Sequence, residues 1–463
     1  MIMTNFWDFE VWGTFNLVAV LLLGLLLANL LKRKIKFLRL SLIPTSVLGG
    51  LLLLLLSMIY HNIVGEDLFD TKFFGGNGMK TLEMITYHSL AIGFIATSFK
   101  SSKQRMNKKR AGEVFDTGLT TVATYLIQGI VGLGITLICA AFFMKDFFPA
   151  AGIILPFGYG QGTGQAMNYG NIYETDYGFV GGKSFGLTIA ALGFLSASLG
   201  GVVHLNILRR KGIFVPQTEE RAEKFESDDI QADDEIPMNG SVDKITVQMG
   251  FVLAAYLLSY LVMYGLGELL PSLKSILYGF NFLFGVLVAV GINSVIIALR
   301  RNGIMKHRYV NEFLMNRISG FFFDLMIVAG IAVIELDVLK GYWGIILVLG
   351  ITGLLITYFY VRFICRRLFP EYENEQFLVM YGMLTGTAST GIVLLREMDR
   401  ELTGPASENL VYQNLPAMVF GFPMMIVATL APQIPYWTLL IITVYFLVLN
   451  IILFRNRIFR KKK

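Results

Sequence analysis

Eleven stretches of about 20 mostly apolar residues constrain this chain more than any other feature of its sequence. An α-helix needs a run of that length to cross the hydrocarbon core of a bilayer. The composition agrees, since 55% of the residues are hydrophobic and only 16% are charged. We therefore expect an all-α polytopic membrane protein. The predicted spans are 11–31, 41–60, 81–99, 116–144, 180–208, 245–269, 276–299, 312–338, 342–364, 408–430 and 436–454.

Two further apolar segments, 150–170 and 376–395, are short and interrupted by glycines. Unpaired backbone N–H and C=O groups in hydrocarbon cost several kcal/mol each, so irregular backbone at membrane depth must be buried in protein or line a wet cavity. We predict that both segments are re-entrant hairpins or broken helices that need not cross the membrane fully.

Basic residues predict the orientation, because Lys and Arg are retained on the cytoplasmic side of a membrane. On one predicted side they cluster in 32–39, 100–110, 209–211, 300–308, 362–367 and the tail from Arg455. The opposite connections contribute the isolated Lys72, Lys145, Lys274 and Lys340. The N-terminus is therefore predicted outside and the C-terminus in the cytoplasm. The first helix is expected to be retained, because acids precede it and no basic leader does.

A long polar stretch, 209–243, divides the chain into two halves. Because five predicted crossings precede it, the second half enters the membrane from the opposite side. We predict a first repeat at 1–208, a cytoplasmic linker at 209–243, an inverted second repeat at 244–434, and an extra C-terminal helix with a basic tail at 435–463. The acids of the linker either bind a cation or partner or lie in a solvated, partly disordered loop.

The glycine segments carry an internal repeat. "YGQGTGQA" (Tyr159–Ala166) and "YGMLTGTA" (Tyr381–Ala388) share Tyr, Gly, Thr, Gly and Ala at matching positions, each before the last crossing of its half. Paired broken segments in inverted repeats are typical of a secondary transporter's binding site, although the glycines could instead serve close helix packing. The candidate binding residues are Gly160, Gln161, Gly162, Thr163, Gly164, Gln165, Asn168, Thr385, Gly386, Thr387, Ser389 and Thr390.

Three stretches, "IPTSVLGG" (Ile43–Gly50), "GQGTGQA" (Gly160–Ala166) and "GTASTG" (Gly386–Gly391), resemble the bacterial sodium:glutamate symporter family. The resemblance implies two inverted five-helix halves, each with a glycine-rich re-entrant segment, and sodium-coupled symport of glutamate or a related small amino acid or organic anion by alternating access. It further implies Na⁺ as coupling ion, no other cofactor, a homodimer and a multi-pass place in the bacterial inner membrane. The chain departs from the family at Gln161, where members tend to have histidine, and at Ser389, commonly a proline.

Asp324 falls near the middle of the span 312–338, where a charge is expensive and usually functional. It could bind sodium, a substrate ammonium or a proton, or make a structural hydrogen bond; family members tend to be apolar there. His88, in the third span, is interpreted as a packed hydrogen-bonding residue or a proton relay. The candidate sodium ligands are Thr163, Thr387, Thr390 and Asp324.

Other function classes are less compatible with the sequence. The four histidines show no zinc-ligand spacing, and neither a Gly-x-Ser-x-Gly nor a P-loop pattern occurs. We therefore expect that the protein is not an enzyme. Cys139 and Cys365 lie in apolar segments and are interpreted as packing residues. Membrane lipid is the expected surrounding and nucleic acid is not an expected partner. A proton-coupled organic-anion transporter and a channel-like pore built on the same loops remain alternatives.

Overall fold

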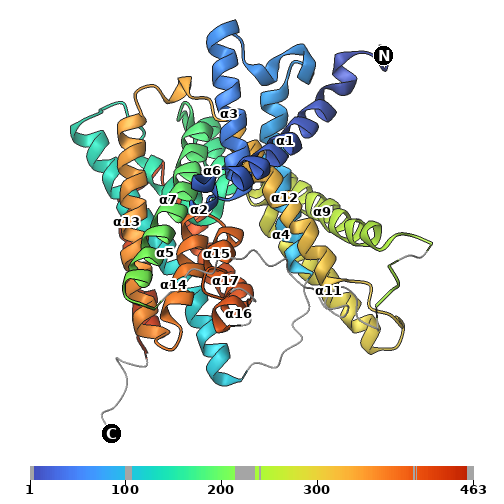
Figure 1. Ribbon diagram of the computed structural model, residues 1–463, viewed down its shortest axis with the longest axis vertical. Helices are drawn as coiled ribbons and strands as arrows, with labels where there is room; N and C mark the ends of the chain where they lie inside the picture. Colours follow the sequence, from blue (N-terminus) through green and yellow to red (C-terminus); the bar gives the residue numbers. More distant parts are fainter. Residues whose placement is uncertain are drawn as a thin grey trace. The chain divides into compact units, whose positions relative to one another are not determined.

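The computed structural model describes residues 5–99, 107–213, 235–238, 241–399, 402 and 404–455, and these residues are organised as helices (Figure 1). Among them, nine helices are long and apolar enough to cross a membrane, or up to ten if one bent pair forms a span. The prediction of an all-α polytopic membrane protein is confirmed. The predicted span 81–99 corresponds to α4 (Gly78–Ser98), which is not among the nine.

The chain divides into two compact units that cut across the predicted halves. The first unit draws on Met1–Met79, Arg105–Gln217 and Gly330–Lys463, and the second on Lys80–Gln104 and Thr218–Ala329. Each predicted repeat therefore contributes to both units. The predicted division of the sequence into two repeats, a linker and an extra helix describes the order of the elements along the chain, and it stays a prediction. Its bounds are 1–208, 209–243, 244–434 and 435–463.

The long helix α5 (Lys108–Phe142) is central to the first unit. It packs against the 3-10 helix η3 (Pro149–Ile154) and against α13 (Trp343–Leu368), α17 (Asn414–Leu430) and α18 (Pro435–Leu453). The extra C-terminal helix α18 is thus a packed part of this unit. An ion pair of 2.6 Å between Arg455 Nη1 and Asp116 Oδ1 joins its end to α5.

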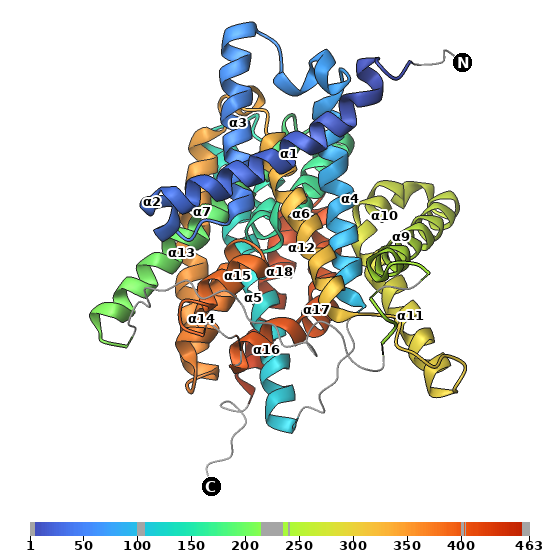
Figure 2. The ribbon, with the colours of Figure 1, turned by 45° about the vertical axis from the view of Figure 1, so that its right-hand side comes forward.

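The glycine segments lie in the same unit. Helix α6 (Leu155–Tyr177) packs along α7 (Gly182–Arg210), and α14 (Glu373–Thr385) packs against α15 (Ala388–Leu395) (Figure 2). Some glycines serve close packing, as the alternative interpretation expected: a Cβ at Gly186 would lie 2.3 Å from the Ala166 carbonyl oxygen.

The N-terminal helices form a further group in the first unit. Helices α1 (Phe9–Lys34) and α3 (Thr45–Val64) pack together, with α2 (Lys36–Leu40) between them in sequence. The glycines of "IPTSVLGG" allow this approach, because a Cβ at Gly49 would lie 3.2 Å from the Gly24 carbonyl oxygen.

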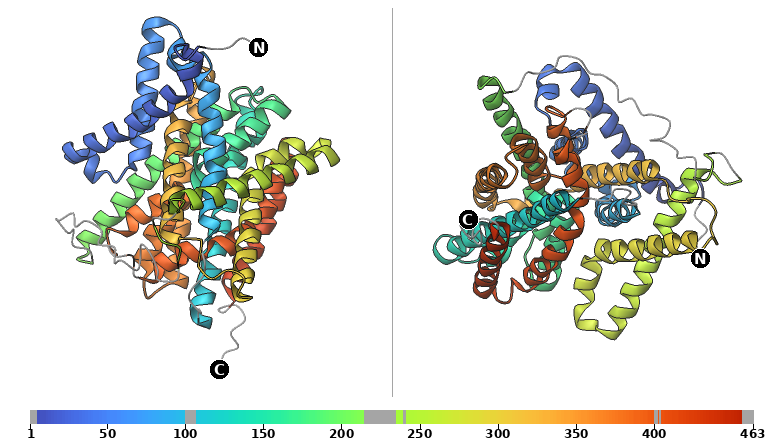
Figure 3. Two further views of the ribbon diagram at one scale, coloured as in Figure 1. Left: turned by 90° about the vertical axis from the view of Figure 1, so that its right-hand side faces the viewer. Right: turned by 90° about the horizontal axis from the view of Figure 1, so that it is seen from below.

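The second unit is built on a helical hairpin. Helices α9 (Lys244–Leu269) and α11 (Asn281–Arg301) pack side by side and are joined through α10 (Lys274–Gly279) (Figure 3). Parts of α4 and α12 (Glu312–Ala332) belong to the same unit. Its apolar core gathers residues of these helices, including Ile95, Phe99, Val252, Ala289 and Met315.

Two predicted spans were wrong in their continuity. The span 276–299 is divided into α10 and α11 at Phe280. The span 408–430 consists of α16 (Pro405–Tyr412) and α17, bent by 47°. The bend follows from Pro416, whose ring would clash with the carbonyl group of Tyr412 four residues earlier in a continuous helix.

Most acids of the linker lie outside the described residues, so both interpretations of them stay predictions. Residues 214–234, 239 and 240 lie outside the described residues, but Glu235 is buried in the second unit. Its carboxylate oxygens lie 2.8 Å from Lys244 Nζ and 2.9 Å from Arg308 Nη2. The paired cations compensate the loss of water around this carboxylate, which anchors the end of the linker.

Candidate functional site

Both glycine segments are broken inside the repeated motifs. Helix α6 is interrupted at Gly162, where φ is 78° and ψ is −169°, a conformation that is essentially restricted to glycine. Helix α14 ends at Thr385 and α15 begins at Ala388, and between them Gly386 has φ −151° and ψ −107° and Thr387 is extended. The prediction of two broken segments is confirmed at residue level.

The two breaks face each other. A Cβ at Gly162 would lie 3.3 Å from Cγ2 of Thr387 and 3.9 Å from the carbonyl oxygen of Gly386. Helix α7 supports both, because a Cβ at Gly193 would lie 2.7 Å from the Thr385 carbonyl oxygen and 3.2 Å from Tyr159 Cα. The repeated motifs, far apart in the sequence, therefore meet at one place in the first unit.

The predicted binding residues differ in burial. Gln161 and Thr387 are half-buried, whereas Ser389 is exposed. Thr387 Oγ1 and Thr390 Oγ1 lie 3.4 Å apart. Thr163 contacts the end of α12, since a Cβ at Gly330 would lie 3.1 Å from Thr163 Oγ1. The buried members of the set are Gly160, Gly162, Thr163, Gly164, Gln165, Asn168, Thr385, Gly386 and Thr390.

Gln165 stands out within this set. Its side chain lies in the first turn after the break at Gly162 and is 1% exposed. Among the described residues, neither its Nε2 nor its Oε1 has a hydrogen-bond partner. A buried amide without partners costs about 1–3 kcal/mol, so such a group calls for a functional explanation or a bound molecule.

Each break exposes both kinds of helix end. The segments that end before the breaks present carbonyl groups and partial negative charge, and those that begin after them present N–H groups and partial positive charge. Cations are favoured at the first kind of end and anionic groups at the second. The arrangement can therefore hold a small charged solute together with a metal cation.

Helix α5 supplies two residues that the sequence analysis missed. Tyr125 Oη donates a hydrogen bond of 3.0 Å to the Gly160 carbonyl oxygen, and Gln128 Nε2 donates one of 2.9 Å to the Leu384 carbonyl oxygen. One helix thus satisfies a carbonyl group just before each break. A glutamine within an apolar span was the available signal, but its partners could not be read from the sequence.

Asp324 and His88 belong to the second unit, whereas the residues of the two breaks belong to the first. Asp324 is exposed on α12 rather than enclosed by protein, and its role as a sodium ligand stays a prediction. His88 is exposed, and its Nδ1 shares a hydrogen bond of 2.6 Å with Tyr256 Oη on α9, so the choice between a packed hydrogen-bonding residue and a proton relay stays a prediction. Cys365 is buried in a hydrophobic core cluster, as expected of a packing residue.

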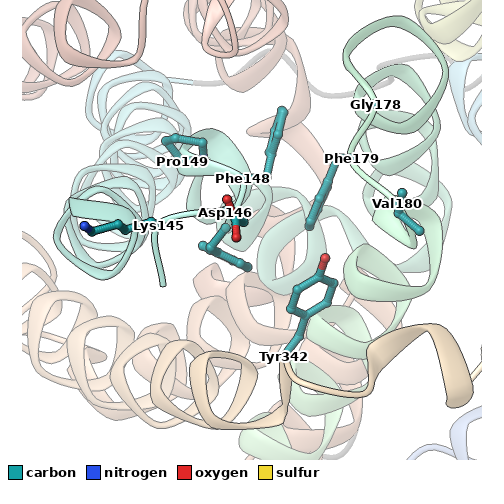
Figure 4. Close-up of a pocket in the computed structure, with 9 residues that line it drawn as sticks. Lys145, Asp146, Phe148, Pro149, Gly178, Phe179, Val180 and Tyr342 are labelled. Carbon is teal, nitrogen blue, oxygen red and sulfur yellow. The ribbon is translucent and has the colours of Figure 1, made fainter. Parts of the chain in front are cut away.

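A pocket lies at a different place in the first unit (Figure 4). It is formed where the connections after α5, after α6 and before α13 come together, and aromatic rings dominate its walls. The Phe148 and Phe179 rings stack with centroids 4.7 Å apart. The residues around it are Lys145, Asp146, Phe147, Phe148, Pro149, Gly178, Phe179, Val180 and Tyr342.

Comparison with known families agrees with this geometry. The family described as sodium/glutamate symporter matches residues 9–383, which is most of the chain. The match includes the break at Gly162 and ends just before the break at Gly386. No individually curated protein matches the chain.

Proposed function

The chain belongs to the sodium/glutamate symporter family, and we propose that it carries glutamate, or a related small amino acid or organic anion, into the cell together with Na⁺ by alternating access. The observation that supports this proposal most strongly is the meeting of two broken helices at Gly162 and Thr387. Each break offers N–H groups for a carboxylate and carbonyl groups for a cation.

The parts of the site have different roles in this proposal. The helix segments that begin at Thr163 and Ala388 hold the substrate carboxylates through their N–H groups, and the Gln165 amide binds the substrate directly. Hydroxyl oxygens of Thr163, Thr387 and Thr390 are candidate sodium ligands, because sodium prefers hard oxygen ligands. Asp324 is the remaining candidate. The flexible backbone at Gly160, Gly164 and Gly386 lets both segments approach the substrate.

The same proposal includes the inverted arrangement of the two repeats. We place the protein in the bacterial inner membrane as a homodimer with the N-terminus outside and the C-terminus in the cytoplasm. The clustering of Lys and Arg in alternate connections supports this orientation.

Cysteine labelling is expected to confirm the orientation. In a protein whose Cys139 and Cys365 are replaced by serine, Lys211→Cys should react with a membrane-impermeant maleimide only from the cytoplasmic side. Asn77→Cys should react only from outside, and both should react after the membrane is opened. Both positions are exposed, so burial will not mask the result. Reaction of both from the same side would contradict the proposed topology.

A hydroxyl at the second break is expected to matter for sodium. Thr387 makes no side-chain cap to α15, so Thr387→Val should change stability little while removing a candidate ligand. We expect the sodium concentration for half-maximal uptake to rise about 2- to 10-fold, the effect of losing one net hydrogen-bond-sized interaction. Thr387→Ser, which keeps the hydroxyl, is the matched control. Equal sodium activation curves for Thr387→Val and wild type would remove this residue from the ion site.

Counterflow in proteoliposomes tests the proposed function itself. Vesicles loaded with one unlabelled solute from a panel of amino acids and dicarboxylates take up the labelled form only if that solute is carried. We expect L-glutamate or a close relative to support counterflow with sodium present and not without it. Counterflow that is equal with and without sodium but depends on pH would favour a proton-coupled organic-anion transporter. Flux that does not saturate would favour a channel-like pore.

A further inference from the structure

We propose that Gln128 Oε1 is a ligand of a sodium ion bound at the C-terminal end of α14. Gln128 is not among the candidate sodium ligands named above. The proposal rests on the proposed function, because it assigns part of the ion coupling to one more residue. It begins from the side chain of Gln128, which is 0% exposed in the middle of α5.

The orientation of this amide is fixed by its partners. The Nε2 atom donates to the Leu384 carbonyl oxygen at 2.9 Å and to Thr357 Oγ1 at 2.7 Å. Because a backbone carbonyl can only accept, the atom facing Leu384 must be the nitrogen, and the amide cannot be turned over without losing that bond. Two bonds to α13 and α14 therefore hold Oε1 in one place.

The oxygen held in this way has no partner. Among the described residues, Gln128 Oε1 is buried and accepts no hydrogen bond. Buried acceptors are nearly always satisfied, and the exceptions mark an ordered water, an ion or a functional role. The two bonds from Nε2 account for the nitrogen of this amide, but no contact of the described residues accounts for its oxygen.

The surroundings select a cation over an anion or a hydrophobic group. Leu384 is the penultimate residue of α14, whose C-terminal end carries partial negative charge. The Gln128 oxygen and the Leu384 carbonyl group thus place neutral oxygens next to the negative end of a helix dipole. Such oxygens at a broken helix are the coordination that a sodium-coupled transporter uses, and a site without a carboxylate suits a monovalent ion.

The position also relates this ion to the substrate. The break at Gly386 separates the end of α14 from the start of α15, so a cation beside Leu384 and an anionic group at the start of α15 would lie on opposite sides of one break. Each would neutralise part of the charge that the other brings into the membrane. Binding of one is therefore expected to favour binding of the other.

The test compares sodium dependence in Gln128→Met and Gln128→Glu. Methionine keeps the length and removes the oxygen, so the sodium concentration for half-maximal uptake should rise about tenfold. Glutamate loses the same two hydrogen bonds from Nε2 as methionine but keeps an oxygen ligand and adds a negative charge, so its sodium affinity should be at or above that of wild type. Sodium-induced thermal stabilisation of the purified protein gives a second readout, and it should be lost in Gln128→Met and kept in Gln128→Glu.

Thr438→Val is the matched control, because Thr438 Oγ1 on α18 is also buried without a hydrogen-bond partner in the described structure and belongs to no proposed site. Its sodium curves should equal those of wild type. Wild-type sodium affinity in Gln128→Met would overturn the assignment and leave a bound water as the explanation of the free oxygen. If Gln128→Met does not fold, a loss of sodium stabilisation in Gln128→Glu would overturn it equally. A wild-type protein without sodium dependence would instead contradict the proposed function.

Discussion

Replacing Gly162 by alanine is expected to lower transport by about 100-fold or more while the protein still inserts into the membrane. Alanine strongly disfavours the backbone conformation at this position, and forcing it costs about 1–3 kcal/mol. The added methyl group would also lie 3.3 Å from Thr387 Cγ2, at the meeting point of the two breaks. The helix should therefore regularise or shift, and the N–H groups that begin at Thr163 would no longer face the second break.

The measurement is the initial rate of sodium-driven glutamate uptake in proteoliposomes, divided by the amount of inserted protein. Gly134→Ala is the matched control, because Gly134 lies in α5, a Cβ added there would meet no neighbouring atom within 4 Å, and alanine favours a helix. It should transport like wild type. A Gly162→Ala protein that transports at the wild-type rate would show that the break at this residue does not serve transport.

Gln165→Met is expected to weaken the apparent substrate affinity by about 10- to 100-fold without lowering stability. The buried amide has no partner in the described structure, so its removal costs the folded protein no hydrogen bond. A hydrogen bond from this amide to a charged substrate group would be lost, and such bonds contribute about 1.5–3 kcal/mol. Stability and affinity should therefore respond differently to the same change.

Gln376→Met provides the contrast for this prediction. Gln376 is equally buried, but its amide accepts from Asn409 Nδ2 at 3.0 Å and donates to Thr117 Oγ1 at 3.3 Å. Removing it leaves buried partners unsatisfied and should cost about 1–3 kcal/mol of stability. Thermal unfolding with and without glutamate, together with uptake kinetics, separates the two variants. Unchanged substrate affinity in Gln165→Met would place that residue outside the substrate site.

The sequence was sufficient to predict most of the helices and the two broken segments, because these depend on local chemistry. A run of about 20 apolar residues predicts a span, and the glycine-rich segments 150–170 and 376–395 predict interrupted helices, although the sequence does not show which glycine carries the break. Pro416 carried a signal of the same kind for the bend before α17, and reading the run 408–430 by hydropathy alone overlooked it.

The remaining features depend on contacts between distant segments. Nothing in the local pattern around Gln128 indicates that its amide reaches Leu384, since those residues meet only after α5 and α14 pack together. The burial of Glu235 depends in the same way on Lys244 and Arg308. The exposure of Asp324 on α12 could not be predicted either, because the length of an apolar run does not specify which face of a helix is covered.

The central claim is that the two facing breaks form one site for substrate and sodium. Measuring the binding of glutamate and sodium to the purified protein tests this claim most directly. Labelled glutamate should bind more tightly as sodium is raised, and sodium should bind more tightly by the same factor as glutamate is raised, because coupling between two sites is reciprocal. Gly162→Ala should lose this coupling, whereas Gly134→Ala should keep it. Glutamate affinity that is independent of sodium in the wild-type protein, or coupling that survives in Gly162→Ala, would contradict the account.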